Sequence, residues 1–102
     1  MKELLFAYGT LRDPHVQKAV FGRTVASEKD ELKGYNKGLV NSCGRRYPAL
    51  VPDKNGMIEG LVLEVTKGEI SQADNYETKA YDRKRATLES GRRAWVYVKA
   101  EK

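Results

Sequence analysis

The chain has 102 residues, of which 40% are hydrophobic and 32% charged, a composition typical of one compact soluble domain. Its single cysteine excludes an internal disulfide and a thiolate metal cluster, and no apolar run is long enough to span a membrane. The N-terminus lacks the pattern of a signal peptide, so we expect one domain over residues 1–102 of a cytoplasmic protein.

The net charge of +5 comes entirely from the C-terminal quarter. From Lys79 to Lys102 there are eight basic and three acidic residues, whereas the first 78 residues carry eleven of each. Such a distribution indicates either a face that attracts anions or nucleic acid, or a solvated face of a hairpin. We favour the second interpretation, because no nucleic-acid-binding motif accompanies the charge.

The N-terminal segment predicts a strand, a glycine turn and a helix. The apolar run at residues 4–7 is typical of a short buried strand, and Gly9 gives the next residues the backbone freedom of a sharp turn. Asp13 followed by Pro14 is a helix start signal, and the helix is expected to stop at Gly22. The backbone N–H groups of such a turn favour an anionic group or a polarised carbonyl.

The middle of the chain has a mixed pattern. Residues 28–33 are charged and are expected at the surface, residues 39–40 suggest a strand, and residues 42–44 read as a loop. Residues 53–56 predict a turn. Residues 57–65 form the strongest predicted strand, in which alternate residues share a face and apolar side chains occur on both faces.

Five residues of these segments leave alternatives open. Gly60 marks a bulge or a close approach of another group. The only histidine, His15, lies near the glycine turn and is either functional or an ordinary surface residue. Arg45 and Arg46 either bind an anion or belong to a solvated loop, and Cys43 is expected to be a small, buried or half-buried residue.

A helix that begins near Thr66 brings one carboxylate to an apolar face. Thr66 followed three residues later by Glu69 has the form of a capping box. Ile70 and Ala73 then fall at helical spacing, and the same face continues to Glu77. Glu77 is therefore either a carboxylate directed into a core or cleft, where burial would raise its pKa, or a solvated residue at a helix end.

Two strands, Tyr81–Glu89 and Arg92–Lys99, are predicted around a hairpin turn at Ser90-Gly91. In the second strand Trp95 and Tyr97 face one way, opposite to the alanine and valines between them.

The residue types limit the chemistry that the chain can perform. One histidine cannot form a multi-histidine metal site, and neither a phosphate-binding loop nor a dinucleotide fingerprint is present. A single acid–base carboxylate, tyrosine hydroxyls and backbone donors remain. This set of groups suits proton transfer with no cofactor and no metal.

Three segments together resemble the gamma-glutamylcyclotransferase-like family, also called AIG2-like. They are Phe6-Ala7-Tyr8-Gly9-Thr10-Leu11-Arg12, then Tyr47-Pro48-Ala49-Leu50 with the later Glu59-Gly60, and finally Asp74-Asn75-Tyr76-Glu77 with Tyr81 and Arg83. Their order and spacing fit the family across nearly the whole chain. The departures are Ala73 where the family usually has leucine and Thr78 where it usually has glycine.

The resemblance implies an α+β fold, a small mixed β-barrel of five or six strands with short flanking helices and a pocket at the barrel mouth. It also implies a cofactor-independent enzyme that cyclises a small gamma-glutamyl substrate to 5-oxoproline and releases an amine. Glu77 would be the catalytic acid–base and Tyr8, Gly9, Thr10 and Leu11 the substrate-binding loop.

Two residues and the overall function have alternative interpretations. Tyr81 would orient the acid or the substrate, or simply pack, and Arg83 would pair with a carboxylate of the substrate or of the protein. Two further hypotheses are a non-catalytic small-molecule binding module on the same fold, and a nucleic-acid-binding protein that uses the C-terminal hairpin with Trp95 and Tyr97. The enzyme is preferred, with no nucleic-acid or membrane partner expected.

Overall fold

Five strands and two α-helices follow one another in the order β1 (Lys2–Ala7), η1 (Thr10–Arg12, a 3₁₀ turn), α1 (Pro14–Phe21), β2 (Ser27–Ser42), β3 (Arg45–Thr66), α2 (Lys67–Glu77), β4 (Tyr81–Thr87) and β5 (Arg93–Lys99). The structure is a computed structural model that describes residues 2–42, 44–77 and 81–99. Cys43 and Thr78, discussed above, lie outside these residues. Within them, no helix has the length and apolarity needed to cross a membrane.

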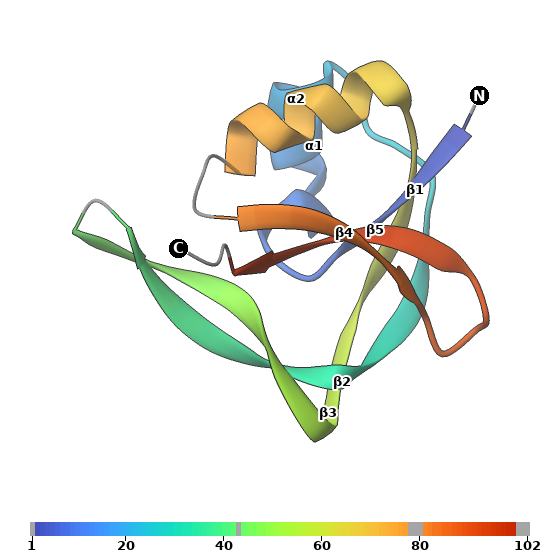
Figure 1. Ribbon diagram of the computed structural model, residues 1–102. Coiled ribbons are helices and arrows are strands. Elements are labelled where there is room, and N and C mark those ends of the chain that lie inside the picture. Colours follow the sequence, from blue (N-terminus) through green and yellow to red (C-terminus); the bar gives the residue numbers. More distant parts are fainter. Residues whose placement is uncertain (1, 43, 78–80, 100–102) are drawn as a thin grey trace.

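The strands form one mixed sheet in the order β2-β3-β1-β5-β4, in which β1 and β5 are parallel and the other neighbours antiparallel. Figure 1 shows α1 and α2 together over one side of this curved sheet, with the long β2–β3 hairpin bending away beneath them. The predicted α+β class is confirmed. In the described residues β2 and β4 are the two edge strands of the sheet, so the strand pairings do not show the expected closed barrel. The two edges are linked by the Glu89 N–H, in the turn after β4, which donates to the Glu31 carbonyl of β2 over 2.8 Å.

The middle of the chain differs most from the expectation. Residues 28–33 and 39–40 belong to a single strand, β2, which pairs with β3 from Ser27 to Ser42. The surface expectation for 28–33 is wrong at Asp30 and Leu32, which are buried. Residues 29, 31 and 33 alternate with these two and remain in contact with solvent, as expected for a strand. Because Asp30 is itself charged, the sequence pattern did not reveal this alternation.

The turn expected at residues 53–56 is a bulge inside β3. The register jumps from Lys33 opposite Met57 to Tyr35 opposite Pro52, so four residues of β3 face one of β2. Asp53 does accept a hydrogen bond from the backbone N–H of Asn55 over 3.0 Å, which is the local chemistry of a turn. That chemistry bends the strand without ending its pairing, and the hairpin connection lies instead between Ser42 and Arg45.

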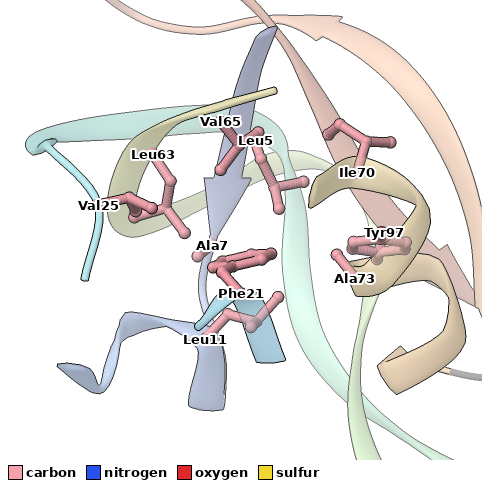
Figure 2. Packing of buried hydrophobic residues seen from close by; sticks show 10 residues of the cluster. All are labelled: Leu5, Ala7, Leu11, Phe21, Val25, Leu63, Val65, Ile70, Ala73 and Tyr97. Atoms are coloured by element: carbon pink, nitrogen blue, oxygen red, sulfur yellow. The ribbon is translucent and has the colours of Figure 1, made fainter. Parts of the chain in front are cut away.

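Hydrophobic side chains are buried on both sides of the sheet. The side under the two helices is shown in Figure 2 and contains Leu5, Ala7, Leu11, Phe21, Val25, Leu63, Val65, Ile70, Ala73 and Tyr97. The other side contains Phe6, Tyr8, Leu32, Leu50, Ile58, Val62, Leu88, Ala94 and Val96. This division confirms the predicted two-faced strand at 57–65.

Gly60 allows β1 and β3 to approach each other next to the N-terminal loop. A Cβ atom at this position would lie 2.4 Å from the Ala7 carbonyl oxygen and 2.7 Å from Cζ of Phe6. The close-approach interpretation of Gly60 is therefore the one that the structure supports, because any side chain there would collide with the end of β1.

Candidate functional site

The start of α2 has the predicted capping box. The Glu69 N–H donates to Oγ1 of Thr66 over 3.1 Å, and the Thr66 N–H donates to Oε1 of Glu69 over 2.9 Å. With the first turn fixed, Ile70 and Ala73 lie in the core and Glu77 follows on the last turn at the edge of that face. Glu77 is half-buried, so the solvated alternative is wrong.

Glu77 lies in a cavity of about 270 Å³ that contains every residue predicted for the site. Its lining is formed by the loop after β1, the last turn of α2 and the adjacent strands β4 and β5: Leu5, Phe6, Ala7, Tyr8, Gly9, Thr10, Leu11, Tyr76, Glu77, Tyr81 and Tyr97. The predicted residues are thus brought together, and their chemical roles remain predictions.

Burial raises the pKa of the Glu77 carboxyl to about 7. Among the residues that the structure describes, no hydrogen bond or ion pair to this carboxyl offsets the loss of solvent. A carboxyl group with this pKa exchanges its proton readily near neutral pH, which is the property expected of a general acid–base.

The loop opposite Glu77 is held by α1. Asp13 caps α1 by accepting the His15 N–H over 2.8 Å, and the helix ends at Gly22 in the left-handed conformation, φ 80°. The buried Gln17 donates from Nε2 to the Leu11 carbonyl over 2.9 Å and accepts the Val25 N–H over 3.1 Å. The predicted strand–turn–helix unit is confirmed, and the buried glutamine fixes its turn.

Two tyrosine hydroxyls tie this loop to the rest of the site. Tyr8 donates to the carbonyl oxygen of Tyr97 over 2.6 Å, and burial raises the pKa of the Tyr8 hydroxyl, with further contributions from Tyr81 and Glu77. The hydroxyls of Thr10 and Tyr76 share a hydrogen bond of 2.6 Å between η1 and α2.

On the opposite side of the cavity, α2 is bound to β4 and β5 through Asp74. The Tyr97 hydroxyl donates to Oδ1 of Asp74 over 2.7 Å, and Nε of Arg83 lies 3.0 Å from the same oxygen. The rings of Tyr81 and Tyr97 meet edge to face with centroids 6.5 Å apart. Of the two roles left open for Arg83, pairing with a carboxylate of the protein is the one observed.

Sequence reasoning missed Tyr76 and Tyr97 as residues of the site. Tyr76 directly precedes Glu77, so its place on the last turn of α2 was a usable signal. Tyr97 comes to the cavity because β5 pairs with β1 in parallel, a long-range contact without a local signal. His15 is exposed, with Nδ1 3.4 Å from Asp13, and does not line the cavity.

A larger groove of about 1100 Å³ adjoins the cavity and shares Tyr8, Gly9 and Thr10 with it. The rest of its lining comes from η1, β2, β3 and the β4–β5 turn and is rich in charges of both signs, including Lys29 and Glu59. In the described residues no three histidine, cysteine, aspartate or glutamate side chains are grouped as metal ligands.

Three arginines of the C-terminal β4–β5 hairpin pair with acids from the first 78 residues. Arg83 pairs with Asp74, Arg85 with Glu3 over 3.6 Å, and Arg92 with Glu28 over 2.5 Å. The guanidinium carbons of Arg83 and Arg85 also lie 4.2 and 4.4 Å from the centre of the Trp95 ring. Part of the excess positive charge is therefore engaged within the fold.

Known proteins match both the sequence and this fold. The family model described as "Gamma-glutamyl cyclotransferase, AIG2-like" matches residues 5–102. The chain is 35% identical to AIG2-like protein C of Arabidopsis thaliana over 81 residues and 34% identical to AIG2-like protein A over 80, which is 78% of this chain in each case. Those alignments cover 46% and 47% of the relatives, so the chain spans about half the length of the curated relatives it matches.

Solved structures give the same result. A solution structure from Arabidopsis thaliana superposes with a TM-score of 0.84 at 26% identity and covers 98% of this chain and 70% of its own. An uncharacterized human protein shares the fold at a TM-score of 0.80 and 16% identity, covering 98% and 68%. With its matching motifs, family model and fold, the chain belongs to the AIG2-like gamma-glutamyl cyclotransferase family.

Proposed function

We propose that the protein cyclises a gamma-glutamyl amine or gamma-glutamyl peptide to 5-oxoproline, with Glu77 as the general acid–base. The observation that carries this proposal is the position of one carboxyl group, with a pKa raised to about 7, in a cavity lined by the loop of residues 8–11. Membership in a family described as gamma-glutamyl cyclotransferases supports the reaction class.

The reaction needs one group that first removes and then returns a proton. The substrate's α-amine is largely protonated near neutral pH and must lose a proton before its nitrogen attacks the side-chain amide carbon. The new C–N bond closes a five-membered ring, the original amide C–N bond breaks, and the leaving nitrogen takes up the proton that was first removed. Glu77 accepts this proton as a carboxylate and gives it to the leaving nitrogen as a carboxylic acid. The ring nitrogen loses one further proton as the lactam forms, and the released amine, which is basic, takes up this proton through water.

The loop after β1 supplies the groups that bind the substrate. The first hydrogen bond of η1 runs from the Arg12 N–H to the Gly9 carbonyl, so the N–H groups of Thr10 and Leu11 precede the hydrogen bonds of this turn. Such N–H groups suit a carboxylate or the oxyanion formed during attack. We place the glutamyl part in the small cavity and the amine part in the larger groove, since the two share residues 8–10.

The test is to incubate the purified protein with a panel of gamma-glutamyl donors and to measure 5-oxoproline. We expect product from the wild type and at least a ~100-fold loss for Glu77→Gln, the scale of general acid–base catalysis. Glu64→Gln is a matched control, because Glu64 pairs with Lys2 over 3.6 Å on a solvent-exposed surface and is expected to keep full activity.

Two further measurements separate this reaction from others. A donor with an acetylated α-amine should give no 5-oxoproline, because it lacks the nucleophile, whereas a hydrolase would release N-acetylglutamate from it. The value of kcat/KM should rise with pH up to about 7 and then level off, because the carboxylate is the active form of Glu77.

Ligand binding without turnover in both wild type and Glu77→Gln would favour the alternative function, a non-catalytic small-molecule binding module.

A further inference from the structure

Asp74 connects three elements around the proposed general base. Its Oδ1 accepts a hydrogen bond from the Tyr97 hydroxyl of β5 over 2.7 Å and lies 3.0 Å from Nε of Arg83 on β4. Asp74 itself is on α2, one turn before Glu77. The same carboxylate therefore connects α2 to both C-terminal strands and engages the Tyr97 hydroxyl and a cation.

The Tyr97 hydroxyl is within electrostatic reach of Glu77. Both side chains line the small cavity, and the charge of Glu77 is one of the influences that raise the pKa of the Tyr97 hydroxyl, after burial and Asp74. A tyrosine hydroxyl has a single hydrogen to donate. In the structure that hydrogen goes to Asp74, so it is withheld from Glu77.

The other groups that face Glu77 are also engaged. Tyr8, directly after β1, donates its hydroxyl hydrogen to the Tyr97 carbonyl, and the hydroxyls of Thr10 on η1 and Tyr76 on α2 bond to each other. Tyr81 on β4 packs against the ring of Tyr97. These are the titratable and polar side chains that line the cavity from each described element.

Arg83 pairs with the same Asp74 oxygen and has a second contact on the sheet. Its Nε–H is not directed at the Asp74 oxygen as in a hydrogen bond, so the 3.0 Å contact is an ion pair. The guanidinium carbon lies 4.2 Å from the centre of the Trp95 ring. The Trp95 contact does not involve Asp74, so we expect Arg83 to stay beside Trp95 when Asp74 is replaced.

We propose that Asp74 is a positioning residue for the reaction proposed above: by accepting the hydrogen of the Tyr97 hydroxyl, it withholds that donor from Glu77 and preserves the basicity of Glu77. This inference rests on the proposed function for its catalytic meaning, but its physical content is a property of the free protein. It can therefore be tested without turnover.

The experiment is a ¹³C NMR titration of the Glu77 carboxyl in protein labelled at glutamate, with Glu77→Gln used to assign the signal. In Asp74→Ala the freed Tyr97 hydroxyl should donate to Glu77 and lower its pKa by about 1, the effect of one added hydrogen bond to a carboxylate. In the double variant Asp74→Ala/Tyr97→Phe the pKa should return to within ~0.3 of the wild-type value, because no hydroxyl remains.

Two single variants separate this effect from a loss of charge. Asp74→Asn removes the negative charge but keeps an oxygen that accepts the Tyr97 hydroxyl, so the pKa of Glu77 should stay within ~0.3 of the wild type. Tyr97→Phe should also leave it there, since that hydroxyl does not serve Glu77 in the native structure. Should Asp74→Ala not fold, Asp74→Leu, which fills the vacated volume, takes its place.

The proposal is overturned if Asp74→Ala leaves the pKa of Glu77 unchanged or raises it. It is equally overturned if the double variant stays as low as Asp74→Ala, or if Asp74→Asn falls by the same amount, because both results would assign the effect to lost charge. If the wild type makes no 5-oxoproline but the titrations behave as expected, the proposed function fails and the role of Asp74 stands. If it is active, the acid limb of its kcat/KM profile should move down by the same ~1 in Asp74→Ala only.

Discussion

Glu69 and Glu77 lie two turns apart on α2, and the protein shifts their carboxyl groups in opposite directions. Glu69, at the start, is only 8% exposed, yet its pKa is held below the usual range, first by the side chain of Arg23, with bonds of 2.8 Å to both oxygens, and then by Thr66. Glu77, at the end, is less buried, yet the pKa of its carboxyl is raised to about 7.

The difference teaches that the pKa of a carboxyl group depends on its partners as well as on its burial. Glu69 has an ion pair and a backbone donor, so its charge is stabilised and it anchors the helix. Near Glu77, Tyr8 and Tyr97 donate their hydroxyl hydrogens to other groups, so the neutral form of Glu77 is favoured and it is ready to exchange a proton. One end of α2 thus stabilises the fold and the other end reduces stability in a way that suits catalysis.

Glu69→Ala should have the largest effect on stability. It removes two charge-assisted hydrogen bonds with Arg23 and one side of the capping box, and we expect the free energy of unfolding to fall by about 3 kcal/mol. Urea denaturation near neutral pH measures this. Glu64→Ala, which loses a single exposed pair with Lys2, should cost about 0.5 kcal/mol or less; equal losses in both variants would mean that Glu69 is no anchor.

Glu77→Gln should stabilise the protein, and only at higher pH. The folded-state pKa of Glu77, about 7, lies above the ordinary value of 4.5, so the wild type is most stable below 4.5 and loses that stability as pH rises through 7. Glutamine does not ionise. We expect the variant to be more stable by about 2 kcal/mol near pH 8, after allowance for partial solvent screening, with almost no difference near pH 4.

Urea midpoints of the two proteins across this pH range test the sign as well as the size. A Glu77→Gln variant that is less stable than the wild type at alkaline pH would show that Glu77 is stabilised as an anion, like Glu69, and would remove the contrast between them.

Thr66→Ala and Gly68→Ala should give the smallest effects, with opposite signs. Thr66 accepts the Glu69 N–H, so its loss should cost about 1 kcal/mol. At Gly68 a Cβ atom would lie 3.9 Å from Oγ1 of Thr66, in ordinary contact, so alanine should add about 0.5 to 1 kcal/mol. Both changes act on the start of α2, and NMR titration should find the pKa of Glu77 unaltered in each.

The parts of the fold that were predicted correctly depend on neighbours in the sequence. The capping box fixed the start and phase of α2, and the signals at Asp13, Pro14 and Gly22 fixed α1. The turn expected at residues 53–56 failed for the converse reason. The Asp53 side chain makes the same local hydrogen bond in a hairpin turn and in a bulge, and only the pairing with β2 distinguishes them.

The sequence by itself determined the helical face that leads to Glu77, the loop of residues 8–11 and the family motifs, because these depend on spacing within short segments. Only the tertiary structure decided the surroundings of Glu77. Tyr8 and Tyr97 are 89 residues apart in the sequence and meet through the parallel pairing of β1 and β5, and Asp74 reaches Tyr97 and Arg83 across elements. A pKa depends on burial and on the direction of nearby donors, and the fold sets both.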